Sequence, residues 1–154
     1  MTEIFAGNSF DVLPNLAALL TAYLLAVPIG WNRERGDRSA GLRTFPLVAV
    51  ASCGFIQAVE PVMAGQAAPL ARVVEGLITG IGFIGGGAIL KMGHNVHGTA
   101  TAASLWATGA IGAAVGLGSY DVAVILSAIT VLSFVVLRPF KKAAHDGEGP
   151  LPDQ

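Results

Sequence analysis

The chain has 154 residues and a formal net charge of −1, so its overall charge offers no basic surface for nucleic acid. Hydrophobic residues make up 53% of the sequence and charged residues only 12%, whereas soluble proteins carry about 25% charged residues. A soluble domain of this size needs a polar shell that this composition can hardly supply. The single cysteine, Cys53, excludes an intrachain disulfide. The composition predicts an integral membrane protein whose first partner is the lipid bilayer.

Five apolar segments follow one another along the sequence and predict an all-α bundle of about five transmembrane helices. A helix needs roughly 20 residues to cross the hydrocarbon of a bilayer, and the first four segments meet that length. Helices are expected because each satisfies its own backbone hydrogen bonds inside lipid. The predicted transmembrane domain covers residues 1–142, with helices at about 13–30, 44–63, 70–90, 100–118 and 122–137, and a disordered cytoplasmic tail is expected at 143–154.

The basic residues predict the orientation of this bundle. With five crossings, the loops at 31–43 and 91–99 and the segment after the fifth helix share one side of the membrane. These stretches hold eight of the nine Lys and Arg residues, and only Arg72 falls on the opposite side. Because basic residues gather in cytoplasmic loops, we expect the N-terminus outside and the C-terminus in the cytoplasm.

Glycines crowd the third apolar segment. The stretch from Gly80 to Gly85 matches the pattern GxGxxG, but a dinucleotide site requires that turn between a strand and a helix. Inside an apolar run the pattern instead favours close packing of helices through small residues spaced four apart. A second interpretation is that the run from Gly85 to Gly87 forms a kink or an unwound turn lining a cavity.

The fourth segment carries small and hydroxyl side chains on one helical face. We expect the hydroxyls to bond to neighbouring helices or to their own backbone. Trp106 lies near mid-span, where an interfacial anchor is not expected, so it is predicted to pack at a helix contact. The helix-packing candidates of the third and fourth segments are Gly76, Gly80, Gly82, Gly86, Thr101, Ser104, Trp106, Thr108 and Gly112.

Ionisable residues within the second and third segments form a candidate intramembrane polar cluster. Helical spacing places Arg72, Glu75 and Thr79 on one face, and such residues usually point into the interior of a membrane bundle. The cluster consists of Gln57, Glu60, Arg72, Glu75 and Thr79. Two interpretations stay open: an ion or proton site or conformational switch, and a structural salt bridge that joins two helices.

The most polar stretch precedes the second helix and is a candidate cytoplasmic interaction site, made of Asn32, Arg33, Glu34, Arg43 and Thr44. It is either a topology signal attracted to anionic headgroups or a docking surface for a partner or phosphate. In the next inner loop His94 and His97 have no identified third ligand, so we expect no metal. No nucleophile, base and orienting group occur together, so neither an enzyme nor a cofactor is expected.

Three motifs resemble the MgtC/SapB family of bacterial inner-membrane proteins and cover about residues 30–120 in the family's order. The first runs from Gly30 to Glu34 and continues from Ala40 to Thr44 and at Leu47 and Val48. The second is the run from Gly80 to Gly87, preceded by Arg72. The third extends from Val96 through Trp106 and Gly112 to Gly118. The sequence departs from the family pattern at Asn32, where an acid often stands, at residues 67–70, where an aspartate is usual, and at Glu75, where an uncharged residue is expected.

The resemblance implies a multi-pass protein of the bacterial inner membrane, in a short form without the C-terminal cytoplasmic domain of some members. Studied members are linked to growth in low magnesium, to virulence and stress, and to restraint of the membrane ATP synthase. The resemblance therefore implies a non-enzymatic regulator that acts through helix–helix contacts, as a homo-oligomer or with another membrane complex. The alternative is a small transporter or channel for magnesium or protons.

Overall fold

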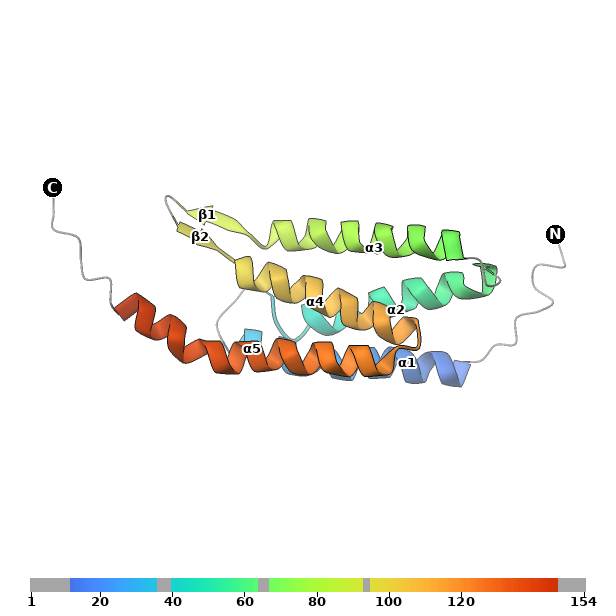
Figure 1. The fold of residues 1–154 in the computed structure, drawn as a ribbon, viewed down its shortest axis with the longest axis horizontal. Helices are drawn as coiled ribbons and strands as arrows, with labels where there is room; N and C mark the ends of the chain where they lie inside the picture. Colours follow the sequence, from blue (N-terminus) through green and yellow to red (C-terminus); the bar gives the residue numbers. More distant parts are fainter. Residues whose placement is uncertain (1–11, 36–39, 64–66, 93–94, 147–154) are drawn as a thin grey trace.

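The structure is a computed structural model that describes residues 12–35, 40–63, 67–92 and 95–146. Within these residues the chain forms five helices and one short hairpin, which confirms the predicted helical fold (Figure 1). The elements in chain order are α1 (Val12–Glu34), α2 (Thr44–Met63), α3 (Ala67–Gly87), β1 (Leu90–Met92), β2 (Asn95–His97), α4 (Thr99–Gly116) and α5 (Tyr120–Asp146).

Three of the described helices are long and apolar enough to cross a membrane, at Val12–Glu34, Ala68–Gly87 and Tyr120–Leu137. The apolar stretch of α2, Thr44–Val59, is shorter. Many large apolar side chains on the outside of the bundle are exposed, for example Leu13 at 80% and Phe83 at 84%. An apolar outer surface on long apolar helices is the pattern of a bundle surrounded by lipid.

Helix α5 is longer than the sequence predicted, because it continues to Asp146. The four residues 143–146 are therefore helical, although they were expected to begin the tail. The stretch from Lys141 to Ala144 consists of lysine and alanine, which are good helix formers, and Gly147 follows directly after the helix. Residues 147–154, the rest of the expected tail, lie outside the described part of the chain.

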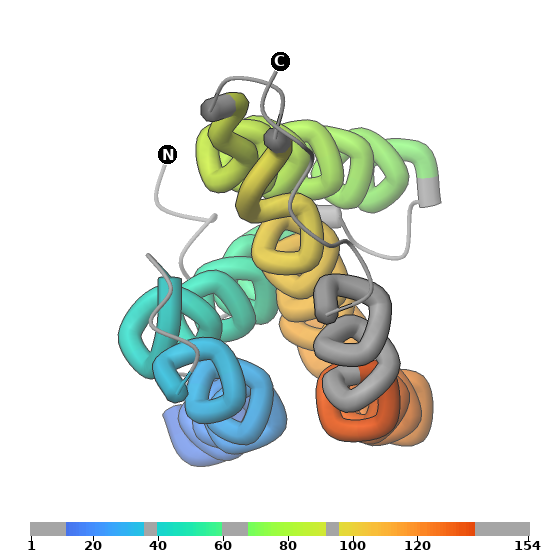
Figure 2. The backbone as a smooth tube through the Cα atoms, turned by 90° about the vertical axis from the view of Figure 1, so that its left-hand side faces the viewer, coloured from blue at the N-terminus to red at the C-terminus, as the bar shows by residue number. Residues whose placement is uncertain are grey.

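The bundle is organised around α4, which packs against each of the other four helices. Figure 2 shows α3 on one side of α4, with α1 and α5 on the other side. The core consists largely of small side chains, among them Ala18, Ala22 and Ala26 on α1 and Ala49 on α2. Small residues allow membrane helices to approach closely, so these helices pack through backbone proximity more than through large side chains.

The predicted hydroxyl face of α4 is buried inside this bundle. Thr101, Ser104 and Thr108 are each at most 3% exposed. For two of these residues the helix also supplies the partner, because Ser104 donates to the carbonyl of Ala100 at 2.8 Å and Thr108 donates to that of Ser104 at 2.8 Å. The hydroxyls of Ser104 and Thr108 are therefore satisfied within α4 while the face packs against its neighbours.

The glycine run at the end of α3 is helical to Gly87 and shows no unwound turn among the residues described. The last turn is tightened, since Ala88 donates to the carbonyl of Gly85 at 3.1 Å and Ile89 to that of Gly86 at 3.1 Å. The third helix was predicted to reach residue 90, but three glycines in succession are poor helix formers and the helix ends after them. The chain then turns back through the antiparallel pair β1 and β2, with Leu90 opposite His97.

A hydrogen bond between α5 and α1 gives a testable contribution to the fold. The Ser127 hydroxyl donates to the carbonyl of Leu25 at 2.7 Å. We expect Ser127→Ala to lower the free energy of unfolding in detergent by about 0.6 kcal/mol, the average for such bonds between membrane helices, and by no more than about 1.7 kcal/mol. Ser133→Ala is the matched control, because the Ser133 hydroxyl bonds only to its own helix, at Ile129. Equal unfolding free energies for the two variants would contradict the prediction.

Candidate functional site

Arg33 lies at the end of α1 and joins three helices. Its side chain is only 4% exposed, because it continues the buried stripe of Ala22, Ala26 and Ile29 along α1. The guanidinium donates to the carbonyl of Ala100 at 2.7 Å, in the first turn of α4. It also lies 3.7 Å from the ring centroid of Phe134 on α5, a cation–π contact. Arg33 therefore ties α1 to both α4 and α5.

Glu34, the next residue, fixes the start of α2. One carboxylate oxygen accepts a hydrogen bond from the backbone N–H of Leu42 at 3.0 Å. The carboxylate lies directly over Gly41, where any side chain would overlap it. The Gly41 carbonyl in turn accepts from Thr44 at 3.1 Å and from Phe45 at 3.2 Å, which begins the helix. Arg33 thus bonds to α4, whereas its neighbour Glu34 bonds to the segment just before α2.

Gly30 completes this junction by allowing the chain before α2 to pass close to α1. A Cβ atom at Gly30 would lie 3.2 Å from the Gly41 carbonyl oxygen and 3.2 Å from the Leu42 Cα. Because both of those atoms belong to the backbone, they cannot move aside as a side-chain tip could. The spacing of the first sequence motif is therefore explained by packing at the α1–α2 junction.

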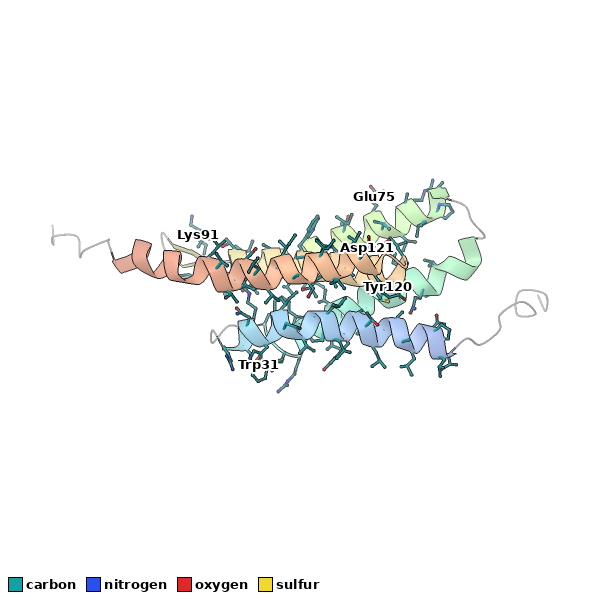
Figure 3. The ribbon with its side chains drawn as sticks, turned by 60° about the horizontal axis from the view of Figure 1, so that its bottom comes forward. Trp31, Glu75, Lys91, Tyr120 and Asp121 are labelled. Atoms are coloured by element: carbon teal, nitrogen blue, oxygen red, sulfur yellow. The ribbon has the colours of Figure 1, made fainter. Side chains whose placement is uncertain are left out.

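The other residues of the predicted cytoplasmic site lie nearer the surface. Arg43 is exposed, whereas Asn32 and Thr44 are half-buried. Arg35 is also exposed and stacks over the Trp31 ring at 5.0 Å. Arg33 faces inward, so Arg43 is the basic member of the predicted set that a binding partner could reach. Trp31 and Lys91 lie at the same end of the bundle, while Tyr120 and Asp121 lie near the other (Figure 3).

An apolar groove runs between α2 and α3, with Arg43 at one end. Its volume is about 700 Å³. Its α3 wall includes two glycines, Gly76 and Gly80, whose missing side chains leave it open. The groove is lined by Arg43, just before α2, by Thr44, Leu47, Val48, Ala51, Ser52 and Phe55 from α2, and by Val73, Gly76, Leu77, Gly80, Ile81 and Ile84 from α3.

The predicted intramembrane polar cluster is not brought together by the described side chains. Arg72, Glu75 and Thr79 are all exposed, and no ion pair joins Arg72 to Glu75 in the described part of the chain. Thr79 bonds to the backbone of its own helix, at the Glu75 carbonyl, over 2.9 Å. Gln57 is half-buried on α2, and the side chain of Glu60 lies outside the described residues.

The whole predicted face of α3 points away from the bundle. Gly82 and Gly86 are exposed together with Arg72, Glu75 and Thr79, and Figure 3 shows Glu75 on the outer side of its helix. The inner side of α3 is instead occupied by an apolar stripe in which Ile81 and Gly85 are buried. Packing these residues against α4 turns the polar and glycine face outward, although the sequence predicted it to face inward.

The helix-packing candidates divide into two groups. On α4, Gly112 is buried with the hydroxyl residues, whereas Trp106 is 50% exposed. A methyl group added at Gly112 would overlap the Ala49 carbonyl oxygen, so α2 and α4 touch there at their backbones. A methyl group added at any of four glycines of α3 would meet no atom within 4 Å, namely Gly76, Gly80, Gly82 and Gly86.

The histidine pair was considered as a metal site and expected not to be one. His97 is exposed on β2, and His94 lies outside the described residues. Among the residues that the structure describes, no group of three or more His, Cys, Asp or Glu side chains is placed to hold a metal ion. The partners of Arg33, Ala100 and Phe134, were missed by sequence reasoning. Arg33 was predicted to lie in a cytoplasmic loop, and the signal that could have shown its burial is its helical spacing from Ala22, Ala26 and Ile29.

Long apolar helices with exposed apolar side chains indicate a helical membrane protein. The MgtC family model matches residues 19–143, and the chain belongs to this family. Protein MgtC of Brucella abortus is 39% identical over 123 residues, covering 80% of this chain and 51% of that protein. Protein MgtC of Salmonella typhimurium is 37% identical over 127 residues, covering 82% and 54%. Protein SrpB of Synechococcus elongatus is 36% identical over 140 residues, covering 82% and 76%.

The chain spans about half the length of the MgtC relatives described above. No solved structure matches it significantly. The family resemblance read from the three motifs is confirmed, and the matched residues include all three. The structure also explains three glycines of these motifs. Gly30, Gly41 and Gly112 each lie so close to the backbone or a side chain of another segment that a larger residue would clash.

Proposed function

We propose that the chain is a non-enzymatic regulator of the bacterial inner membrane that packs the outer face of α3 against another membrane-embedded chain. The observation that carries this proposal is the set of α3 glycines whose Cβ positions are empty. Glycine in a helix interior costs about 1 kcal/mol relative to alanine, and no internal contact of Gly82 or Gly86 offsets it. Small residues four apart are the usual means by which membrane helices associate.

The charges on the same face support a protein-covered surface. Arg72 and Glu75 are exposed on α3, and ionisable side chains that face lipid are costly. In the proposed topology all five helices cross the membrane, and the end with Trp31, Arg43 and Lys91 is cytoplasmic. Arg72 and Glu75 then lie toward the outer end of α3, where a partner helix could pair with both.

The identity of the partner is proposed from the family. Two of the relatives carry the name MgtC, and the resemblance links such proteins to magnesium limitation, stress and the membrane ATP synthase. We therefore propose a membrane subunit of the ATP synthase as the partner of α3. A second copy of this chain is the other occupant consistent with a small-residue face, because identical helices often pair through such motifs.

Photo-crosslinking in native membranes tests this proposal. A crosslinking residue at Gly82 should form an adduct with an ATP synthase subunit, whereas the same residue at Ile129, exposed on α5, should not. Dependence of the Gly82 adduct on Glu75, tested with Glu75→Gln, would show that the polar end of the face takes part. Adducts with this chain alone would favour the homo-oligomer, and equal adducts from both positions would contradict a role for α3.

A small ion transporter or channel is the second candidate function. It is favoured by the presence of Arg72 and Glu75 within a membrane-length helix, because such residues often mark ion pathways. Proteoliposomes loaded with a magnesium-sensitive or pH-sensitive dye test it. Flux above that of empty vesicles, lowered by Glu75→Gln, would support transport. Flux equal to empty vesicles, across pH and membrane potential, would exclude it.

A further inference from the structure

We infer that the groove between α2 and α3 binds one acyl chain of an anionic phospholipid whose headgroup is held by Arg43. The groove is concave and apolar along its length, which suits hydrocarbon. Its one charged residue, Arg43, lies at one end beside Thr44, the first residue of α2, and Ser52 is the other polar residue of the lining. A lipid presents the same arrangement, with one charged end and a long apolar body, so groove and ligand match in both respects.

The dimensions of the groove fit one leaflet of a bilayer. On α3 its wall runs from Val73 to Ile84, which is about 16 Å along a helix at roughly 1.5 Å per residue. The hydrocarbon core is about 30 Å thick, so one leaflet is roughly 15 Å deep. Since α2 and α3 are consecutive and antiparallel, Arg43 lies at the same end as Ile84, at the membrane surface. A chain entering beside Arg43 would reach about the bilayer centre at the far end of the groove.

The charge of Arg43 specifies an anionic headgroup. Its side chain is exposed, unlike that of Arg33, which lies inside the bundle. A guanidinium presents a planar fork of donors that matches phosphate oxygens. Gly76 and Gly80 keep the groove open, because a methyl group at either position would meet no atom within 4 Å. A large residue at Gly80 would therefore fill the groove without disturbing the packing of α3 on α4.

Native mass spectrometry of the purified chain tests this site with two lipids of matched acyl chains, phosphatidylglycerol and phosphatidylcholine. We expect one phosphatidylglycerol to be retained about fivefold more tightly, the factor that corresponds to roughly 1 kcal/mol per basic residue near a membrane surface. Arg43→Gln should abolish this preference. Arg35→Gln, which removes a charge at the same end but outside the groove, should leave it unchanged.

Substitutions that fill the groove provide the second arm of the test. Gly80→Leu should lower retention of both lipids, and Ala51→Leu, from the opposite wall, should do the same. Gly82→Leu adds the same side chain to α3 outside the groove and should retain both lipids as the unmodified chain does. Equal retention of the two headgroups, or equal behaviour of Gly80→Leu and Gly82→Leu, would overturn the inference. Loss of self-association in Gly80→Leu with lipid retention intact would show that the groove holds a second copy, and would also overturn it.

Discussion

Replacing Arg33 with methionine should lower the free energy of unfolding by about 2–5 kcal/mol, the sum of two contacts of known size. The hydrogen bond to the Ala100 carbonyl involves a charged donor, and such bonds contribute about 1.5–3 kcal/mol. The cation–π contact with Phe134 adds about 0.5–2 kcal/mol. Methionine keeps much of the apolar stem but offers neither contact, so the polar contacts from Arg33 to α4 and α5 are lost.

Arg35→Met is the matched control, since Arg35 is exposed and its side chain stacks over the Trp31 ring. We expect its unfolding free energy in detergent to stay within about 0.5 kcal/mol of the unmodified chain, as for most surface changes. Arg33→Lys should fall between the two, because an ammonium can donate to Ala100 but cannot lie flat on a ring. Equal effects of Arg33→Met and Arg35→Met would contradict the role assigned to Arg33.

Arg33 shows which features of the site could be predicted from the sequence and which could not. Helical spacing would place it on the stripe of Ala22, Ala26 and Ile29, but residues 31–43 were predicted to form a loop, so its burial was not expected. The partners do not follow, because Ala100 lies 67 residues further along the chain and Phe134 is further still. Only the packing of α1 beside α4 and α5 brings them together. A docking role was therefore considered for a residue whose contacts are internal.

Helix α3 shows a different limit. Its spacing correctly groups Arg72, Glu75 and Gly82 on one face, since all three are exposed together. Spacing cannot say whether that face points into the bundle or out of it. The opposite face carries Ile81 and Gly85, which pack on α4. The two faces of α3 compete for contact with α4, and the face with Ile81 and Gly85 makes that contact. Charged residues in membrane helices usually face the interior of the bundle, and we expected this of Arg72 and Glu75, but both face outward. An outward face of a membrane helix need not be apolar if another chain covers it.

The five-helix architecture itself was predictable, because the sequence contains five separate apolar segments, four of them long enough to span a membrane. The hairpin of β1 and β2 was not, since three-residue strands leave almost no periodic signal. The groove between α2 and α3 could not be predicted from the sequence either. It depends on the relative placement of α2 and α3 and on two glycines, Gly76 and Gly80, whose spacing also fits ordinary helix packing.

Gly112→Ala should destabilise the bundle by about 1–3 kcal/mol, the usual penalty for overfilling a packed interior. The added methyl group would overlap the carbonyl oxygen of Ala49 and lie 2.8 Å from the Ser52 Cβ. Both atoms belong to α2, and a backbone carbonyl cannot rotate away as a side chain does. The α2–α4 contact must therefore widen, and α4 is the helix on which the other four depend. Gly112→Leu should prevent folding altogether.

Two further glycine-to-alanine changes separate this packing effect from helix propensity, which favours alanine equally in all three. Gly109→Ala should cost less than Gly112→Ala, because its methyl group would meet only the Ile81 side chain, which can change rotamer. Gly86→Ala should stabilise the isolated chain by about 0.5–1 kcal/mol, since the space around it is open and alanine restricts the unfolded chain. The stability measured by unfolding in detergent should thus be highest for Gly86→Ala, followed by the unmodified chain, then Gly109→Ala, and lowest for Gly112→Ala.

If Gly112→Ala were as stable as Gly86→Ala, the close backbone approach of α2 and α4 would be wrong. If Gly86→Ala proved destabilising in the purified chain, its face would already be covered there, by a second copy.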